Sequence, residues 1–482
     1  MLGFAFGVGW FTAGGWWIGA GLFRFTAAGA FGAIAITLLA VIYLSCFPAI
    51  AGLLIGAARC CTAWQARWLM IAASWTGTAW LRGTLFGGLP WMSVGTGQLT
   101  GPLSSWAPIG GGLSVEFVTL IVAAALVELI CAGTRTPWDR RHAFWSILLV
   151  SLVFSASISL KTIGWTQPAG EMSVRLAQGN LPQQEKFSVQ GLRHAAEVYG
   201  AAIAQSDAQI TILPETAFPM TWEALPIELR HNIRRFASDR RTTVLLGALI
   251  QEPSGAITNN LLLVRPDSPQ RARSDLSDTA YDDRYAKQHL LFIGEYLPES
   301  LHWLGRRLNV AYSSLSPSLR LGSNHLLEIR SAQIAPAICF ESLFGSTIAS
   351  NARYSNILVN ISNFAWFTGT WAADQDLDVI RMRSLETGRW TARAANSGIT
   401  ALIDEKGDIV DVLPQDVAAV LDGRVELRAG LTPYDRAGDL PVILICGLSL
   451  LTWAARGSAR SLTGRGYQID LPTPRNGVER KT

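Results

Sequence analysis

The stretch Ile334-Ala335-Pro336-Ala337-Ile338-Cys339-Phe340-Glu341 places a cysteine directly after a short apolar run. Such a run predicts a buried strand over 334–338, so Cys339 would stand where that strand ends. Because the other five of the six cysteines lie in or beside long apolar segments, a disulfide framework is not indicated. These five are Cys46, Cys60, Cys61, Cys131 and Cys446. A single thiol is more often a small buried hydrophobic group than a nucleophile. A catalytic interpretation of Cys339 therefore depends on the residues that accompany it.

The composition is that of a membrane protein. The chain has 482 residues, of which 49% are apolar and 18 are tryptophan, which is too apolar for an ordinary soluble protein of this size. A membrane-spanning helix needs roughly 20 residues, and we expect six such helices. They are Gly3–Leu22, Ala28–Ala57, Trp68–Phe86, Leu113–Ala132, Ala143–Leu160 and Leu440–Ala455. The first lacks a basic start and a small-residue cleavage site, which favours a retained anchor over a signal peptide.

The basic residues predict the orientation of these helices. Arginines gather at alternate helix ends, at Arg59, Arg67, Arg135, Arg140, Arg141, Arg456, Arg460 and Arg465. The positive-inside rule then puts both termini in the cytoplasm. We therefore expect a membrane domain of about five helices over 1–161, an extracytoplasmic domain over 162–439, a last membrane helix over 440–456 and a disordered cytoplasmic tail over 457–482. The net charge of +4 is mild and gives no sign of a nucleic-acid surface.

The pattern from Ser173 onward predicts an α/β domain. We expect strands at 173–177, 210–213, 243–249, 260–264, 334–338, 357–361, 391–395 and 400–404. We expect helices at 192–206, 226–240 and 374–387. The segment 267–284, rich in Ser, Asp and Arg, is interpreted as a surface loop.

One loop in the membrane half contains many turn residues. It runs from Gly87 to Gly112 and includes Trp91 and Trp106. Two interpretations stay open: an interfacial connector with ordinary aromatic-belt tryptophans, or the frame of an entry portal for lipids above the catalytic domain.

Three reactive residues each follow a strand-like run, namely Glu215, Lys287 and Cys339. A thiol with a pKa of about 8.5 is mostly protonated at neutral pH, so a nucleophilic cysteine needs a base and a nearby cation. Glu215 would be the base and Lys287 the cation. Lys287, with the backbone N–H after Cys339, would also stabilise the oxyanion formed at an ester or amide carbonyl. Structural alternatives remain: Glu215 as a helix cap, Lys287 on a solvated face and Cys339 in the core.

No cofactor is expected, and the sequence suggests no metal site. The six histidines are scattered, and none pairs with a cysteine at ligand spacing.

Motifs around the three residues resemble those of the nitrilase, or carbon-nitrogen hydrolase, superfamily. They are Leu213-Pro214-Glu215-Thr216-Ala217, Tyr285-Ala286-Lys287-Gln288-His289-Leu290, Gly294-Glu295-Tyr296-Leu297-Pro298 and Ile338-Cys339-Phe340-Glu341. With Gly88-Leu89-Pro90-Trp91 and the apolar helices, the whole chain is similar to the membrane-bound branch of that superfamily, the apolipoprotein N-acyltransferases.

This resemblance implies an αββα sandwich domain joined to a polytopic helical membrane domain, in the inner membrane of a bacterium, with catalysis on the periplasmic side. It implies that Cys339 takes an acyl chain from a phospholipid as a thioester and passes it to the N-terminal amine of a diacylglyceryl-cysteine on an apolipoprotein. Glu295 and Glu341 match further carboxylates near the nucleophile, one of which would orient Lys287 or the acceptor amine. Trp91, Phe187 and Phe340 match supporting or substrate-binding positions.

The chain departs from the family pattern at four places. It starts where the third helix normally begins, Phe187 stands at a usual tryptophan, Phe364 at a small polar residue or aspartate, and Asp376 at a usual histidine. These departures leave the acceptor open. The alternatives are a conjugal-transfer TraB-like paralogue with another acceptor, a membrane-tethered amidase that uses water, and a scaffold without turnover.

Overall fold

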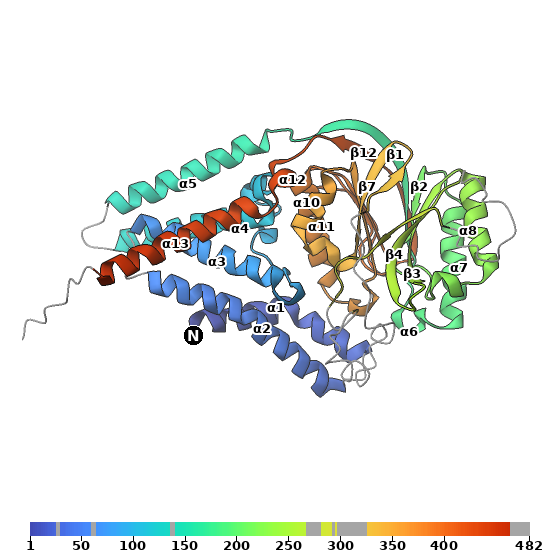
Figure 1. The fold of residues 1–482 in the computed structure, drawn as a ribbon, viewed down its shortest axis with the longest axis horizontal. Coiled ribbons are helices and arrows are strands. Elements are labelled where there is room, and N and C mark those ends of the chain that lie inside the picture. The colour runs from blue at the N-terminus through green and yellow to red at the C-terminus, as the bar shows by residue number, and fades with distance from the viewer. Residues whose placement is uncertain are drawn as a thin grey trace, which may run out of the picture.

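The computed structural model describes residues 1–25, 29–58, 64–134, 140–266, 281–291, 295 and 325–462. Figure 1 shows the long helices on one side and two β-sheets on the other. The chain runs through five long helices, builds the sheet domain and returns to the helical side as a last helix. The long helices are α1 (Leu2–Phe25), α2 (Gly29–Ala58), α3 (Trp64–Thr84), α4 (Ala107–Thr134), α5 (Arg140–Lys161) and α13 (Leu440–Leu462).

A helix forms at each of the six predicted apolar segments. Among the described residues, three stretches are long and apolar enough to cross a membrane: Gly29–Ala57, Pro102–Cys131 and Arg140–Lys161. Leu440–Ala455 is apolar but shorter. The long apolar helices are those of a membrane protein, whereas the number of crossings stays a prediction. The predicted tail is helical at its start, because α13 continues to Leu462 through a segment without proline.

The domain between α5 and α13 contains two six-stranded sheets, with strand orders β12-β1-β2-β3-β4-β5 and β11-β10-β9-β8-β7-β6. In each sheet, three central strands run parallel: β1, β2 and β3 in the first, and β7, β8 and β9 in the second. The first sheet comprises β1 (Gln167–Gln178), β2 (Ile210–Ile212), β3 (Thr243–Gln251), β4 (Ile257–Val264), β5 (Asp283–Ala286) and β12 (Ala419–Ala429). The second comprises β6 (Leu327–Ile329), β7 (Ala332–Ile338), β8 (Ile357–Ser362), β9 (Thr391–Ala395), β10 (Ala401–Ile403) and β11 (Ile409–Val412).

The two sheets pack face to face between helices. Their shared core includes Leu176 and Ile212 from the first sheet and Ile338 and Ile361 from the second. Helices α7 (Val189–Ala204) and α8 (Ile227–Arg240) cover the first sheet, while α10 (Gly345–Ala352) and α11 (Ala372–Thr387) lie on the side of the second. Burying apolar side chains on both faces of each sheet is what produces the predicted αββα sandwich.

All eight predicted strands and all three predicted helices of this domain form, with ends shifted by a few residues. The interpretation of 267–284 as a loop is wrong at its end, because Asp283 and Arg284 begin β5 and pair with Leu263 and Leu262 of β4. Partner strands, rather than polar composition, decide this local structure. Residues 267–280 lie outside the described part of the chain.

Helix α11 attaches the sandwich to the membrane half. The Gln375 side chain accepts hydrogen bonds from the indole Nε1 of Trp17 at 3.1 Å and of Trp91 at 2.8 Å. Near the C-terminal end of α11, Glu386 accepts from the backbone N–H of Gly112 at 2.6 Å. The second sheet, which carries Cys339, is therefore held close to the long helices.

Candidate active site

Cys339 occupies a tight turn at the end of β7. Its φ angle is +54°, a left-handed conformation that L-residues rarely adopt. Such a conformation costs on the order of 1–3 kcal/mol and persists where the surroundings enforce it. Here the Ser342 hydroxyl donates to the Cys339 carbonyl at 3.0 Å, and the Ile338 N–H donates to the Glu341 carboxylate at 2.8 Å. The turn thus holds a partly exposed thiol in a fixed direction.

Glu215 lies on a loop that follows β2 and crosses β3 at close range. A Cβ atom added to Gly247 of β3 would lie only 2.6 Å from the Glu215 Cα and 2.6 Å from the Pro214 oxygen. Gly247 also donates its N–H to that oxygen at 3.2 Å, and its own carbonyl accepts from the Ala217 N–H at 2.9 Å. A glycine at this position is what allows the Glu215 loop to reach the site.

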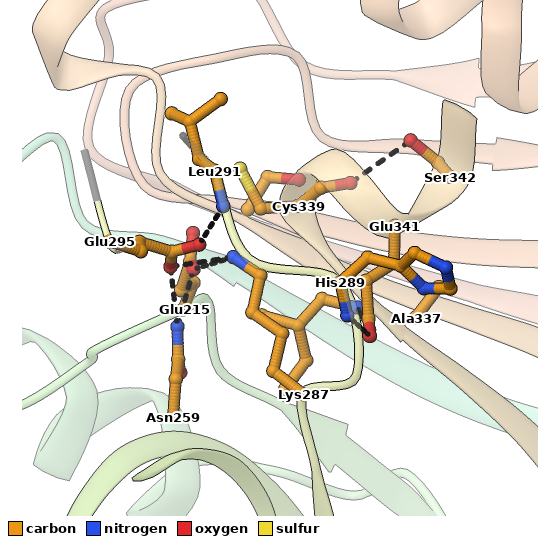
Figure 2. Close-up of polar contacts among 12 residues, drawn as sticks. Glu215, Asn259, Lys287, His289, Leu291, Glu295, Ala337, Cys339, Glu341 and Ser342 are labelled. Atoms are coloured by element: carbon orange, nitrogen blue, oxygen red, sulfur yellow. Dashed lines mark hydrogen bonds and ion pairs between the residues drawn. The ribbon is translucent and has the colours of Figure 1, made fainter. Parts of the chain in front are cut away.

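Lys287 directly follows β5 and contacts two carboxylates. Its Nζ lies 3.1 Å from Glu215 Oε1 and 2.7 Å from Glu295 Oε1. The Asn259 amide on β4 donates to the same two oxygens at 2.8 Å and 3.2 Å. Figure 2 shows these side chains converging beside the Cys339 sulfur. Lys287 is only 2% exposed, so these contacts take place away from bulk water.

Electrostatics in this cluster set the protonation states. Burial disfavours the charged form of Lys287, but Glu215 and Glu295 outweigh it and raise the lysine pKa well above its usual value. Burial and Glu215 raise the pKa of the Cys339 thiol well above its usual value, and Lys287 only partly opposes them. The site at rest therefore pairs a permanent ammonium with a protonated thiol that needs a base.

Glu341 connects the lysine segment to the cysteine turn. Besides the Ile338 N–H, its carboxylate accepts from the Tyr285 hydroxyl at 3.0 Å, from the His289 N–H at 3.1 Å and from the Gln288 N–H. Burial raises the pKa of Glu341, and the backbone N–H groups of Ile338, Gln288 and His289 oppose the shift together with Lys287. Of the two further carboxylates, Glu295 contacts Lys287 itself, whereas Glu341 holds the backbone on both sides of the site.

The predicted aromatic positions divide into two groups. Trp91 and Phe340 are buried in one apolar cluster that also contains Trp17 and Phe364. Trp91 therefore packs against the sandwich domain, in the same cluster as the residue that follows Cys339. Phe187 lies outside that cluster with 43% of its surface exposed.

Three buried polar residues at the site were missed by sequence reasoning. Asn259 bridges the two carboxylates, and Lys186, only 1% exposed, donates from Nζ to the Glu215 carbonyl at 3.3 Å. Arg393 forms an ion pair with Asp376 at 2.7 Å and lies over the ring of Phe364. Two of the departures from the family pattern, Phe364 and Asp376, thus meet on one arginine. The sequence shows only that Lys186 precedes an aromatic residue, which does not mark it as part of the site.

No metal site is found in the part of the chain that the structure describes, since no three His, Cys, Asp or Glu side chains there could hold an ion together.

Comparison with known proteins gives matches along nearly the whole chain. Residues 1–125 match the apolipoprotein N-acyltransferase N-terminal domain, and residues 173–429 match the carbon-nitrogen hydrolase family. The apolipoprotein N-acyltransferase of Ralstonia nicotianae is 34% identical, over 94% of this chain and 84% of its own length. That of Nitrosomonas europaea is 32% identical, over 96% and 89% respectively. Among solved structures, a nitrilase-superfamily protein of Saccharomyces cerevisiae matches 63% of this chain and 98% of its own, with 14% identity and a TM-score of 0.39.

Proposed function

Since the chain belongs to the apolipoprotein N-acyltransferase family, within the nitrilase superfamily, we propose that it is a cysteine-dependent N-acyltransferase of lipoprotein maturation. The acyl donor is a membrane phospholipid, and the acceptor is the N-terminal amine of a diacylglyceryl-cysteine on an apolipoprotein. One observation carries the proposal: a buried ammonium, Lys287, contacts two carboxylates beside a thiol in a strained turn.

The first half-reaction forms a thioester. Glu215 takes the proton of the Cys339 thiol, and the sulfur attacks the ester carbonyl carbon of the phospholipid. Lys287 and the backbone N–H after Cys339 stabilise the negative oxygen of the tetrahedral intermediate. The ester C–O bond then breaks, and Glu215 returns its proton to the oxygen of the departing lysophospholipid. The acyl group stays on Cys339.

The second half-reaction transfers the acyl group to nitrogen. The lipoprotein amine attacks the thioester carbonyl, and Glu215 accepts a proton from the attacking nitrogen. The C–S bond breaks, an amide forms, and the proton on Glu215 returns to the Cys339 sulfur. Each cycle thus restores the resting protonation states.

The raised pKa of Lys287 supports these roles. A lysine that stays charged can meet the oxyanion in both half-reactions without losing its proton to the lipid amine. Glu295, at 2.7 Å from Nζ, positions Lys287, and Glu341 positions the turn of Cys339 relative to the lysine segment.

The contacts of α11 support a lipid substrate. Gln375 and Glu386 tie the sandwich to residues of the membrane half, so the thiol lies close to the end of the long apolar helices. The acyl chains of a phospholipid and of a lipid-modified protein both lie in the membrane that such helices would cross. We propose an inner-membrane location, with the sandwich on the periplasmic side.

The intact mass of the protein, purified from membranes, tests this proposal. The wild type and Cys46→Ala, the matched thiol control, should carry a long-chain adduct that hydroxylamine removes, and Cys339→Ala should carry none. If the wild type formed no adduct after incubation with phospholipid in the absence of an acceptor, the acyltransferase mechanism would be wrong.

A further inference from the structure

Lys186 is a second buried lysine at the active site, and the reaction described above does not use it. It is the last residue of the short helix α6 (Gln183–Lys186) and is 1% exposed. A lysine is seldom fully buried unless it is paired. Its Nζ makes one hydrogen bond within the described residues, to the main-chain oxygen of Glu215 at 3.3 Å.

The charges around Cys339 do not balance without Lys186. Glu215 and Glu295 share the single ammonium of Lys287, which leaves one excess negative charge when both carboxylates are ionised. Asp376 adds nothing to this excess, because its charge is neutralised by the ion pair with Arg393 at 2.7 Å. When Glu215 takes the thiol proton, the excess stays at one negative charge but moves from Glu215 to the sulfur, in a site with little water, where charges interact strongly. A second ammonium removes this excess.

The surroundings of Lys186 keep it charged near neutral pH. Burial lowers the lysine pKa to about 8, while the charges of Glu215 and Cys339 favour the ammonium. The further charged groups that act on the thiol are Lys287, Asp376 and Glu295. Lys186 is thus an ammonium below about pH 8 and loses its charge in mildly alkaline solution.

We propose that Lys186 is a positioning residue and the second cation of the active site: it holds the main chain of Glu215 and offsets the excess negative charge, so that the Cys339 thiolate can form. This inference rests on the proposed function, since it assumes that Cys339 is the nucleophile. A lysine that only anchored the backbone would affect folding but not the ionisation of the thiol.

The test measures how fast iodoacetamide alkylates Cys339, followed by mass spectrometry of the peptide that contains it, over about pH 6 to 10. Lys186→Gln keeps a hydrogen-bond donor for the Glu215 carbonyl but removes the charge, whereas Lys186→Arg keeps the charge. Arg193→Gln, at an exposed position of α7, is the matched control.

Up to about pH 8, where Lys186 is charged, we expect Lys186→Gln to be alkylated at Cys339 roughly tenfold more slowly than the wild type. Over the same pH range, up to about pH 8, Lys186→Arg and Arg193→Gln should follow the wild type. The inference is overturned if Lys186→Gln follows the wild type, or if Lys186→Arg shifts as far as Lys186→Gln. If Lys186→Gln does not fold in a thermal unfolding check, Lys186→Arg still decides: above about pH 8 it keeps the charge that Lys186 loses, so Cys339 should be alkylated faster than in the wild type, and equal rates at every pH would overturn the inference.

The alkylation reaction needs neither phospholipid nor acceptor, so the two proposals fail separately. An alkylation shift in Lys186→Gln without any acyl adduct in the wild type would refute the proposed function and leave the charge role intact. A wild-type adduct with superimposable alkylation profiles would do the reverse.

Discussion

The membrane half and the sandwich domain both bury charged groups, but they use them differently. In the membrane half, the Arg82 guanidinium donates to the carbonyls of Leu89 and Trp91. Nearby, Glu116 accepts from the Trp75 indole at 2.7 Å and from the Ser93 hydroxyl at 2.6 Å. In the sandwich, Lys287 and its two carboxylates surround a thiol instead.

This difference shows that buried charge alone does not mark an active site. The Arg82 and Glu116 side chains bond to the loop that carries Trp91, and the partners named above include no thiol. The Lys287 cluster faces the Cys339 thiol, whose pKa is raised by burial and by Glu215 and lowered by Lys287. The two clusters are nevertheless joined, because Trp91 packs in the same apolar cluster as Phe340, the neighbour of Cys339. Arg82 thus holds the loop whose Trp91 packs beside the turn of Cys339.

The largest effect should follow from removing Lys287, the cation of the sandwich cluster. Lys287→Met leaves Glu215 and Glu295 facing each other without a counter-charge, and also removes the donor for the oxyanion. We expect acyl-enzyme formation to slow by about 10²–10³-fold and the free energy of unfolding to fall by roughly 3–5 kcal/mol. Single-turnover mass spectrometry and thermal unfolding measure the two effects. Lys161→Met, at an exposed helix end, is the control and should change neither.

Removing the base should affect chemistry far more than stability. Because the Cys339 pKa is raised, Glu215→Gln should slow acyl-enzyme formation by about 10²–10⁴-fold at neutral pH. The isosteric amide still fits the pocket. Raising the pH should recover part of the rate, since hydroxide then removes the thiol proton. A rate for Glu215→Gln that equalled the wild type at every pH would exclude Glu215 as the base.

Changes at Arg82 and Glu116 should affect stability far more than the chemistry at Cys339. Glu116→Leu leaves the Trp75 indole and the Ser93 hydroxyl without an acceptor, and we expect a loss of roughly 2–4 kcal/mol in stability. The alkylation profile of Cys339 should keep its midpoint, because Glu116 does not set the thiol pKa. Glu197→Leu, at an exposed position, provides the control. A displaced alkylation midpoint in Glu116→Leu would mean that Glu116 also influences the ionisation of the Cys339 thiol.

The contact between the two halves should give the smallest effect, a pH-dependent one. Burial raises the pKa of Glu386, which accepts from Gly112, to about 7. A carboxyl whose pKa is higher in the folded state binds more protons when folded, so its contribution is present at low pH and declines as pH rises from about 4.5 to 7. The full decline is at most about 3 kcal/mol.

Glu386→Gln should therefore flatten the fall of the unfolding temperature over that pH range. Its Gly112 contact is preserved, because the amide oxygen still accepts. An equally steep fall in Glu386→Gln would mean that other groups cause the pH dependence.

The strand pattern predicted an α/β domain, and the family resemblance implied the αββα sandwich. Apolar runs of strand length precede Glu215 and Cys339, whereas the strand before Lys287 was not predicted. Glu215, Lys287 and Cys339 converge because the strands that they follow, β2, β5 and β7, belong to two packed sheets. Glu215, Lys287 and Cys339 stand in loops directly after strands, and each lies in a short motif that can be recognised from the sequence alone.

The remaining parts of the site depend on contacts between distant segments. Asn259 reaches the carboxylates because β4 pairs with β5, and Lys186 reaches Glu215 from a separate helix. Neither has a local sequence signal, since an Asn in a strand or a Lys at a helix end is ordinary. The strands β5, β6, β11 and β12 were missed for the same reason: their polar residues lie at sheet edges, and only their partners make them strands.

The central claim is that Cys339 carries an acyl group to an amine, and transfer from the isolated acyl-enzyme tests it most directly. The acyl-enzyme is mixed with a peptide that begins with diacylglyceryl-cysteine or with the same peptide after N-acetylation. We predict that the acyl mass leaves Cys339 and appears on the free-amine peptide only. Release of the acyl chain as free fatty acid, at the same rate with either peptide, would contradict the claim and identify a hydrolase.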